Sequence, residues 1–164
     1  AESAGVYSAL ALIGRAVYYV AWMFIMLLLP KVIKLHKSGK ETRQLLNLYV
    51  RYTVLLCALV VSVSYLMPQF IVTTLFGESY LAVAKYLWLY ALATSMFAIS
   101  NIYTYYALSL ERYIPTAITI GFGCLQIGLI ALYHNSLMEV VLMQVLAMAV
   151  LLISQIIYHY QSNK

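Results

Sequence analysis

Long apolar runs alternate with short polar connections along the whole chain. A helix that crosses a bilayer needs about 20 mainly apolar residues, and five runs reach that length. We predict spanning helices over residues 5–29, 45–67, 80–108, 114–133 and 137–158. The pattern therefore predicts an all-α integral membrane protein, with five transmembrane helices in a single transmembrane domain that covers residues 1–164.

Several residues indicate where these helices begin and end. Pro30 follows the first run, where a helix stops or kinks. Ser38 with Glu41, and Ser136 with Glu139, have the spacing of a capping box, so we expect a helix to begin at each serine.

Two stretches, residues 69–76 and the third apolar run, are less regular. Residues 69–76 form a short apolar segment between Pro68 and Gly77, which predicts an interfacial half-helix or a re-entrant turn. The third run would measure about 43 Å as one helix, longer than the ~30 Å hydrocarbon core. Either it tilts, or its first turns with Lys85 lie in the interface.

The fourth run carries residues with special backbone properties. Pro115 falls in its first turn, where the missing N–H costs nothing. Gly121, Gly123 and Gly128 follow, and small residues let membrane helices approach closely, so we expect these glycines to lie at helix contacts.

Composition supports a membrane location. The chain is 65% hydrophobic and 9% charged, whereas soluble domains are about 25% charged. The net charge of +5 does not indicate nucleic-acid binding, because the basic residues cluster in one connection and at helix ends instead of forming an exposed stripe.

The basic connection sets the expected orientation. Residues 31–43 hold five cations and one acid, which is typical of a cytoplasmic segment that touches anionic membrane lipids. A substrate gate is the alternative. With five spans, the 109–112 connection and the C-terminus are also expected to be cytoplasmic.

Arg15 stands in the middle of the first apolar run and is the first candidate site residue. An arginine near the bilayer centre costs about 2.5–3.5 kcal/mol, so it usually faces protein or a water-filled cavity. Tyr18, Tyr19 and Trp22 lie on or beside its helix face. We interpret these four residues as the lining of a cavity for an anionic or sugar-bearing substrate. The alternative is that Arg15 binds a backbone carbonyl and only shapes the bundle.

Uncharged polar residues add two more candidates for this lining, Asn101 and Gln126, which fall within the third and fourth runs. Hydrogen bonds between helices are the alternative role for such groups. We find no P-loop, no G-x-G-x-x-G, no paired cysteine motif and no H-x-x-x-H, and none of the five acids lies deep in a predicted span. We therefore expect no enzymatic activity, no metal and no cofactor.

Short motifs resemble one membrane transporter family. They are Gly5-x-Tyr7-Ser8-Ala9-Leu10, Ile13-Gly14-Arg15-x-Val17-Tyr18, Leu29-Pro30-Lys31-Val32, Gly39-Lys40, and Leu75-Phe76-Gly77-x-x-Tyr80 followed by Ala82 and Ala84. Together they resemble the polysaccharide-export flippases of the multidrug/oligosaccharidyl-lipid/polysaccharide transporter superfamily.

The resemblance implies a two-lobe transporter of about twelve helices around a central cavity. Such a protein flips lipid-linked oligosaccharide across the bacterial inner membrane for surface polysaccharide biosynthesis. This chain would form most of the second, C-terminal lobe of a longer chain, and the missing N-terminal lobe would come from the same chain or from a partner. Arg15 falls where this family often carries a cavity-facing cation, which could hold the pyrophosphate of an undecaprenyl-linked glycan.

Two alternatives remain open. A multidrug or cation antiporter of the same superfamily is one, although no deep acid is present here to carry a proton or sodium ion. A membrane assembly subunit that transports nothing is the other.

Overall fold

A computed structural model describes the backbone of residues 2–162 and the side chains of 15, 18, 19 and 22–162. Every element in this described part is helical. The elements, in chain order, are α1 (Glu2–Lys37), α2 (Arg43–Leu66), α3 (Pro68–Phe76), η1 (Glu78–Tyr86), α4 (Leu87–Ser109), α5 (Ile114–Leu132) and α6 (Leu137–Gln161).

Four helical segments in the described part are long and apolar enough to cross a membrane: α2, η1 with α4, α5 and α6. The predicted all-α membrane protein is confirmed at this level. The span over 5–29 lies in α1, but most of its side chains fall outside the described residues, so the fifth span stays a prediction.

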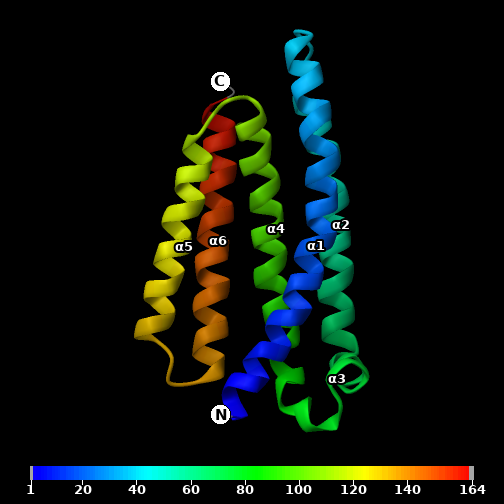
Figure 1. Ribbon diagram of the computed structural model, residues 1–164, viewed down its shortest axis with the longest axis vertical. Helices are drawn as coiled ribbons and strands as arrows, with labels where there is room; N and C mark the ends of the chain where they lie inside the picture. Colours follow the sequence, from blue (N-terminus) through cyan, green and yellow to red (C-terminus); the bar gives the residue numbers. More distant parts are fainter. Residues whose placement is uncertain (1, 163–164) are drawn as a thin grey trace.

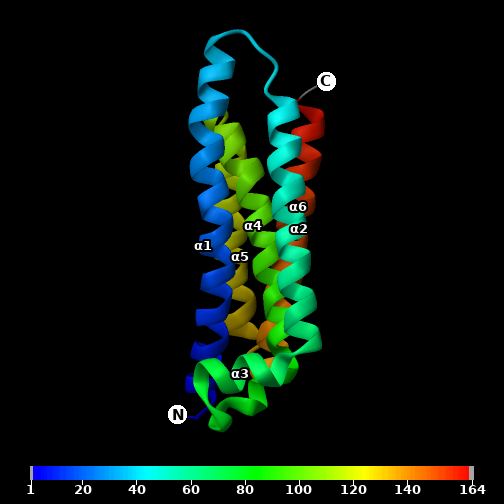
Figure 2. The ribbon, with the colours of Figure 1, turned by 90° about the vertical axis from the view of Figure 1, so that its right-hand side faces the viewer.

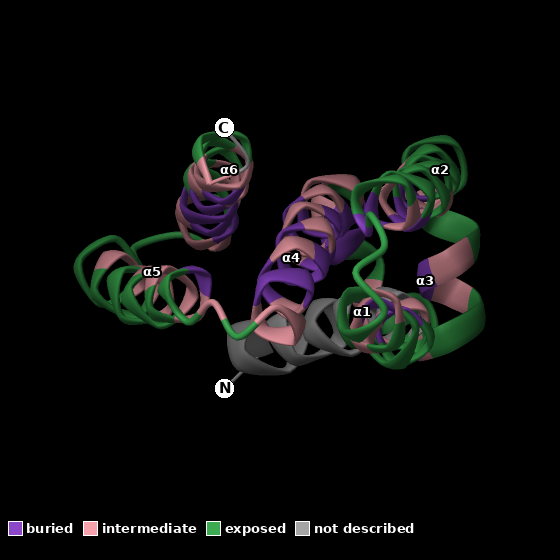
Figure 3. Cartoon of the chain, turned by 90° about the horizontal axis from the view of Figure 1, so that it is seen from above, coloured by how far each residue is buried: buried purple, intermediate pink, exposed green. Residues whose placement is uncertain are grey.

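Helix α4 forms the centre of the bundle. α1 and α2 lie on one side of it, and α5 and α6 lie on the other (Figures 1 and 3). On the first side, Ile25 and Leu28 of α1 pack with Leu46 of α2 and Ile102 of α4. On the second side, Ala93 of α4 packs with side chains of α6, among them Ala147, Met148 and Leu151.

The first connection differs from the prediction in two ways. The first helix does not end at Pro30 but continues to Lys37. Ser38 begins no helix either: its hydroxyl donates to the Lys34 carbonyl at 2.8 Å and so closes α1. Gly39 then turns the chain with a φ of +66°. As a result α2 begins only at Arg43.

The third apolar run is divided between two kinds of helix. Residues 78–86 form a 3₁₀ segment, and the α-helix begins at Leu87. The short helix α3 matches the predicted half-helix and lies across one end of the bundle (Figure 2). Val72 of α3 and Val83 of η1 pack with Leu87, which fixes this corner against α4.

The last two helices begin as predicted. The Ser136 hydroxyl accepts a hydrogen bond from the Glu139 N–H at 3.2 Å, which is the serine half of the predicted capping box, and Pro115 stands in the first turn of α5. The prediction for the glycines is wrong. A methyl group at Gly121, Gly123 or Gly128 would meet no atom within 4 Å among the residues described, so none of them lies at a close helix contact.

The connections at residues 38–42 and 110–113 and the end of α6 lie at one end of the bundle (Figure 1). The hydroxyls of Thr42 and Tyr106 share a hydrogen bond of 2.8 Å there. Arg112 donates to the Ser162 carbonyl at 3.2 Å. We call this region, together with the last turns of α1 and the first turn of α2, the basic end, because it carries Lys34, Lys37, Lys40, Arg43 and Arg112.

Candidate functional site

Aromatic side chains join α1 to α4. The rings of Tyr18 and Phe97 stack with their centroids 5.6 Å apart, and Trp22 meets Tyr105 edge-on at 5.2 Å. Tyr18 and Trp22 are one turn apart on α1 and are themselves 5.9 Å apart. Aromatic pairs of this kind contribute roughly 0.5–1.5 kcal/mol each beyond the area they bury. Two predicted site residues therefore hold α1 against α4.

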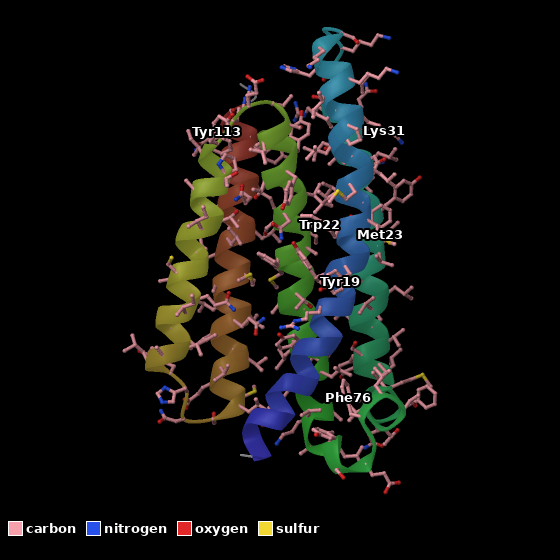
Figure 4. All side chains as sticks on the ribbon, in the orientation of Figure 1. Tyr19, Trp22, Met23, Lys31, Phe76 and Tyr113 are labelled. Carbon is pink, nitrogen blue, oxygen red and sulfur yellow. The ribbon has the colours of Figure 1, made fainter. Side chains whose placement is uncertain are left out.

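Arg15 and Tyr19 lie on an exposed part of α1. The Arg15 side chain is exposed, and Tyr19 keeps 62% of its surface accessible. Figure 4 shows the neighbouring residues: Trp22 lies on the side of α1 that faces α4, and Met23 lies on the opposite side. Arg15 and Tyr19 are therefore available to groups outside the bundle.

Asn101 of α4 is buried, and its side-chain amide forms a hydrogen bond within its own helix. Its Nδ2 donates to the carbonyl of Phe97, one turn earlier, at 3.1 Å. This bond satisfies a polar side chain at a position that is only 6% exposed. Asn101 therefore binds the backbone of its own helix and does not line the cleft described next.

Gln126 lines a cleft of about 160 Å³ between α4, α5 and α6. Thr94 and Phe97 of α4 and Gln144 and Met148 of α6 form the rest of its lining. Since a water molecule needs roughly 10–15 Å³ of such space, the cleft has room for several waters or for a small polar group.

The cleft offers uncharged hydrogen-bonding groups. The Gln144 Oε1 is buried and has no partner among the described residues. The Thr94 hydroxyl already donates to the carbonyls of Tyr90 and Ala91, at 3.0 Å each, which leaves its oxygen lone pairs as acceptors. A ligand with hydroxyl donors suits these groups better than an anion does.

Phe97 separates the two parts of the candidate site. It takes part in the stack with Tyr18 and also lines the cleft with Gln126. The six predicted residues therefore do not form one lining: Arg15 and Tyr19 are exposed on α1, Tyr18 and Trp22 pack, Asn101 is internal, and Gln126 faces the cleft.

Sequence reasoning did not select Phe97, Thr94 or Gln144 for this site. A signal for Gln144 was present, because α5 and α6 form an antiparallel hairpin. Gln126 stands seven residues before Tyr133, and Gln144 stands eight residues after Ser136. Residues about equally far from such a turn lie side by side, so these positions could have predicted that the two glutamines line the same space.

No metal site was found in the part of the chain that is described, since no three His, Cys, Asp or Glu side chains there lie close enough to share an ion. Comparison with known proteins gives no matching family model, no matching curated protein and no matching solved structure. The resemblance to flippases therefore rests on the sequence motifs alone.

Proposed function

We propose that this chain belongs to a membrane transporter that flips lipid-linked oligosaccharide, an undecaprenyl-pyrophosphate-linked glycan, across the bacterial inner membrane for surface polysaccharide biosynthesis. In this proposal the chain supplies most of the second lobe, and a first lobe completes the cavity. The basic end faces the cytoplasm, because positively charged connections remain on that side during insertion.

The exposure of Arg15 is the observation that carries this proposal. Arg15 lies one turn before Tyr18, whose ring stacks on Phe97 in the middle of α4. A guanidinium that faced hydrocarbon at this depth would cost about 2.5–3.5 kcal/mol. Its face of α1 therefore requires water or another protein surface. A second lobe across a water-filled cavity supplies both.

The Arg15 side chain suits the pyrophosphate of such a substrate, and the cleft between α4, α5 and α6 suits its sugars. The guanidinium fork of Arg15 can bind two oxygens of a pyrophosphate at once. The cleft beside Gln126 and Gln144 holds uncharged groups that suit sugar hydroxyls. At about 160 Å³ it is smaller than pockets for whole drug-sized ligands, so it suits one edge of a sugar ring.

The test replaces Arg15 in the complete two-lobe protein and measures both surface glycan and the amount of protein in the membrane. We expect Arg15→Ala to lower export about tenfold or more at an unchanged protein level, because a charge-assisted contact is worth roughly 1.5–3 kcal/mol. Arg15→Lys should keep part of the activity, since it retains the charge but loses the fork.

Arg51→Ala is the matched control. Arg51 is also an exposed arginine, but it lies on α2, two turns after the start of that helix, and not on α1. It should export normally. Normal export by both Arg15 variants would contradict the proposal. If the Arg15 variants change drug efflux and not glycan export, the antiporter is favoured. If the variants only release a partner protein, the assembly subunit is favoured.

A further inference from the structure

A second, smaller cavity lies at the basic end, away from Arg15 and the cleft. Its volume is about 10 Å³, which is the space of one water-sized oxygen. The lining comes from α4, the following connection, α5 and α6, and includes Tyr103, Arg112, Pro115, Gln155, His159 and Ser162.

Gln155 is a buried polar residue in the lining of this cavity. Its Nε2 donates to the Pro115 carbonyl at 2.9 Å and to the Thr119 hydroxyl at 3.0 Å, so its orientation is fixed. The side chain is 1% exposed, yet its Oε1 has no partner in the described part of the chain. A buried acceptor without a donor costs about 1–3 kcal/mol. A hydroxyl group that entered the cavity would satisfy it.

Two arginines and one histidine, which come from three elements, lie at or near this cavity. Arg112 follows α4, and its Nη1 donates to Ser162. The guanidinium has five N–H groups, so the N–H groups on its other nitrogens can donate to a ligand. His159 of α6 lies 5.4 Å from the Tyr103 ring. Arg43 of α2 stands 6.0 Å above the ring of Tyr160, which in turn is 5.9 Å from His159.

The location of this opening matches a membrane surface. Lys34, Lys37 and Lys40 lie at the same end of the bundle and are exposed, and they outnumber the exposed acids there, Glu41 and Glu111. Basic pockets between membrane helices on the cytoplasmic side are a recurrent binding site for anionic lipid headgroups.

We propose that this pocket binds the phosphoglycerol headgroup of an anionic membrane lipid. The phosphate lies between Arg112 and Arg43, and one glycerol hydroxyl enters the cavity and donates to the Gln155 Oε1. The acyl chains extend along the exposed apolar surface of the bundle. This site is independent of the transport proposal, because it involves neither Arg15 nor the cleft.

The experiment compares lipids bound to the purified, full-length protein by native mass spectrometry after exchange into mixed micelles. The probes are phosphatidylglycerol, phosphatidylethanol, which is also a singly charged phosphodiester but lacks the glycerol hydroxyls, and phosphatidylcholine, with matched acyl chains. We expect phosphatidylglycerol to be retained about threefold to tenfold better than phosphatidylethanol, since one neutral hydrogen bond is at stake, and phosphatidylcholine to be retained least. This comparison requires no mutation.

Two variants locate the site. Arg112→Gln should weaken retention of both anionic lipids about tenfold. Arg51→Gln should leave retention unchanged, because Arg51 lies two turns further along α2 than Arg43, outside the proposed site. Gln155→Leu should erase the preference for phosphatidylglycerol over phosphatidylethanol.

Three outcomes would overturn the proposal. Equal retention of phosphatidylglycerol and phosphatidylethanol by the unmodified protein would mean that only water occupies the cavity. Unchanged retention by Arg112→Gln would place the lipid elsewhere. Displacement of the lipid by inorganic pyrophosphate at equal concentration would identify a free phosphate compound as the ligand.

Discussion

Helices α4 and α5 are neighbours in the chain but differ in what they bury. α4 buries twelve residues, among them the polar Ser95, Ser100, Asn101 and Thr104. α5 buries only Pro115 among its 19 residues, and large apolar side chains such as Ile120 and Ile127 lie on its surface. The helix with more polar residues is the inner one.

This difference follows from the bilayer as solvent. Lipid tails are as apolar as leucine, so little free energy is gained when the Ile127 side chain moves from lipid into the protein interior. Polar groups gain hydrogen bonds inside, and small residues such as Ala93 and Ala98 let neighbouring helices approach. The largest effects of mutation are therefore expected on α4 and the smallest on α5.

Ala98→Leu should give the largest effect. Ala98 is fully buried and packs with Cys57 of α2, so three added carbon atoms force the helices apart at a cost of roughly 1–3 kcal/mol. The free energy of unfolding in dodecyl sulfate–mixed micelle titrations measures it. Ala131→Leu, at an exposed position of α5, is the control and should stay within about 0.5 kcal/mol. Equal effects at both positions would remove the distinction between the two helices.

Gln155→Leu should cost about 1 kcal/mol in the same titration, because the loss of the two bonds that Nε2 donates outweighs the removal of the unpaired Oε1. The variant removes the donor to the carbonyl of Pro115, the one buried residue of α5, and so loosens α5 from α6. Ser154→Ala is the neighbouring control, because the Ser154 hydroxyl bonds only to the carbonyl of Val150 in its own helix. A smaller loss for Gln155→Leu than for Ser154→Ala would contradict this attachment.

The bond between Thr104 and Thr119 should give a smaller effect. Their hydroxyls lie 3.1 Å apart and connect α4 with α5. A double-mutant cycle with Thr104→Val and Thr119→Val should return a coupling of about 0.6 kcal/mol, the usual value for such bonds between membrane helices. A coupling of zero would show that the two hydroxyls act separately.

Ile127→Ala should give the smallest effect. Ile127 is 71% exposed on α5, so its removal leaves no cavity and should change the unfolding free energy by less than about 0.5 kcal/mol. A loss of about 2 kcal/mol would indicate that another protein surface, and not lipid, covers this face of α5. That result would also suit the proposed second lobe, if it appeared only in the complete transporter.

The sequence predicted the helices well and their ends unevenly. Ser136 caps α6 because its backbone is extended, with φ −139° and ψ 153°, which brings its hydroxyl to the Glu139 N–H. Ser38 has the same spacing to Glu41, but its own N–H still bonds to the Lys34 and Leu35 carbonyls of α1. Spacing alone does not distinguish a serine that begins a helix from one that ends the previous helix.

The candidate site was predicted less completely, for a related reason. Sequence identified Asn101 and Gln126 as polar residues within apolar runs, but not the direction of each side chain. Asn101 turns to the Phe97 carbonyl, whereas Gln126 faces a cleft with Gln144. How each helix is rotated about its axis depends on packing between helices, which periodicity within one helix does not specify.

The length of α1 has a consequence for how the protein meets charged partners. Its 36 residues measure about 54 Å, and its last turns extend beyond the other helices at the basic end (Figures 1 and 2). Lys34 and Lys37 are thus held on a rigid support at the outer limit of the bundle. Their field decays over about 8 Å at physiological ionic strength and about 3 Å at 1 M salt. The rate at which anions arrive at this end should therefore fall steeply as salt is added.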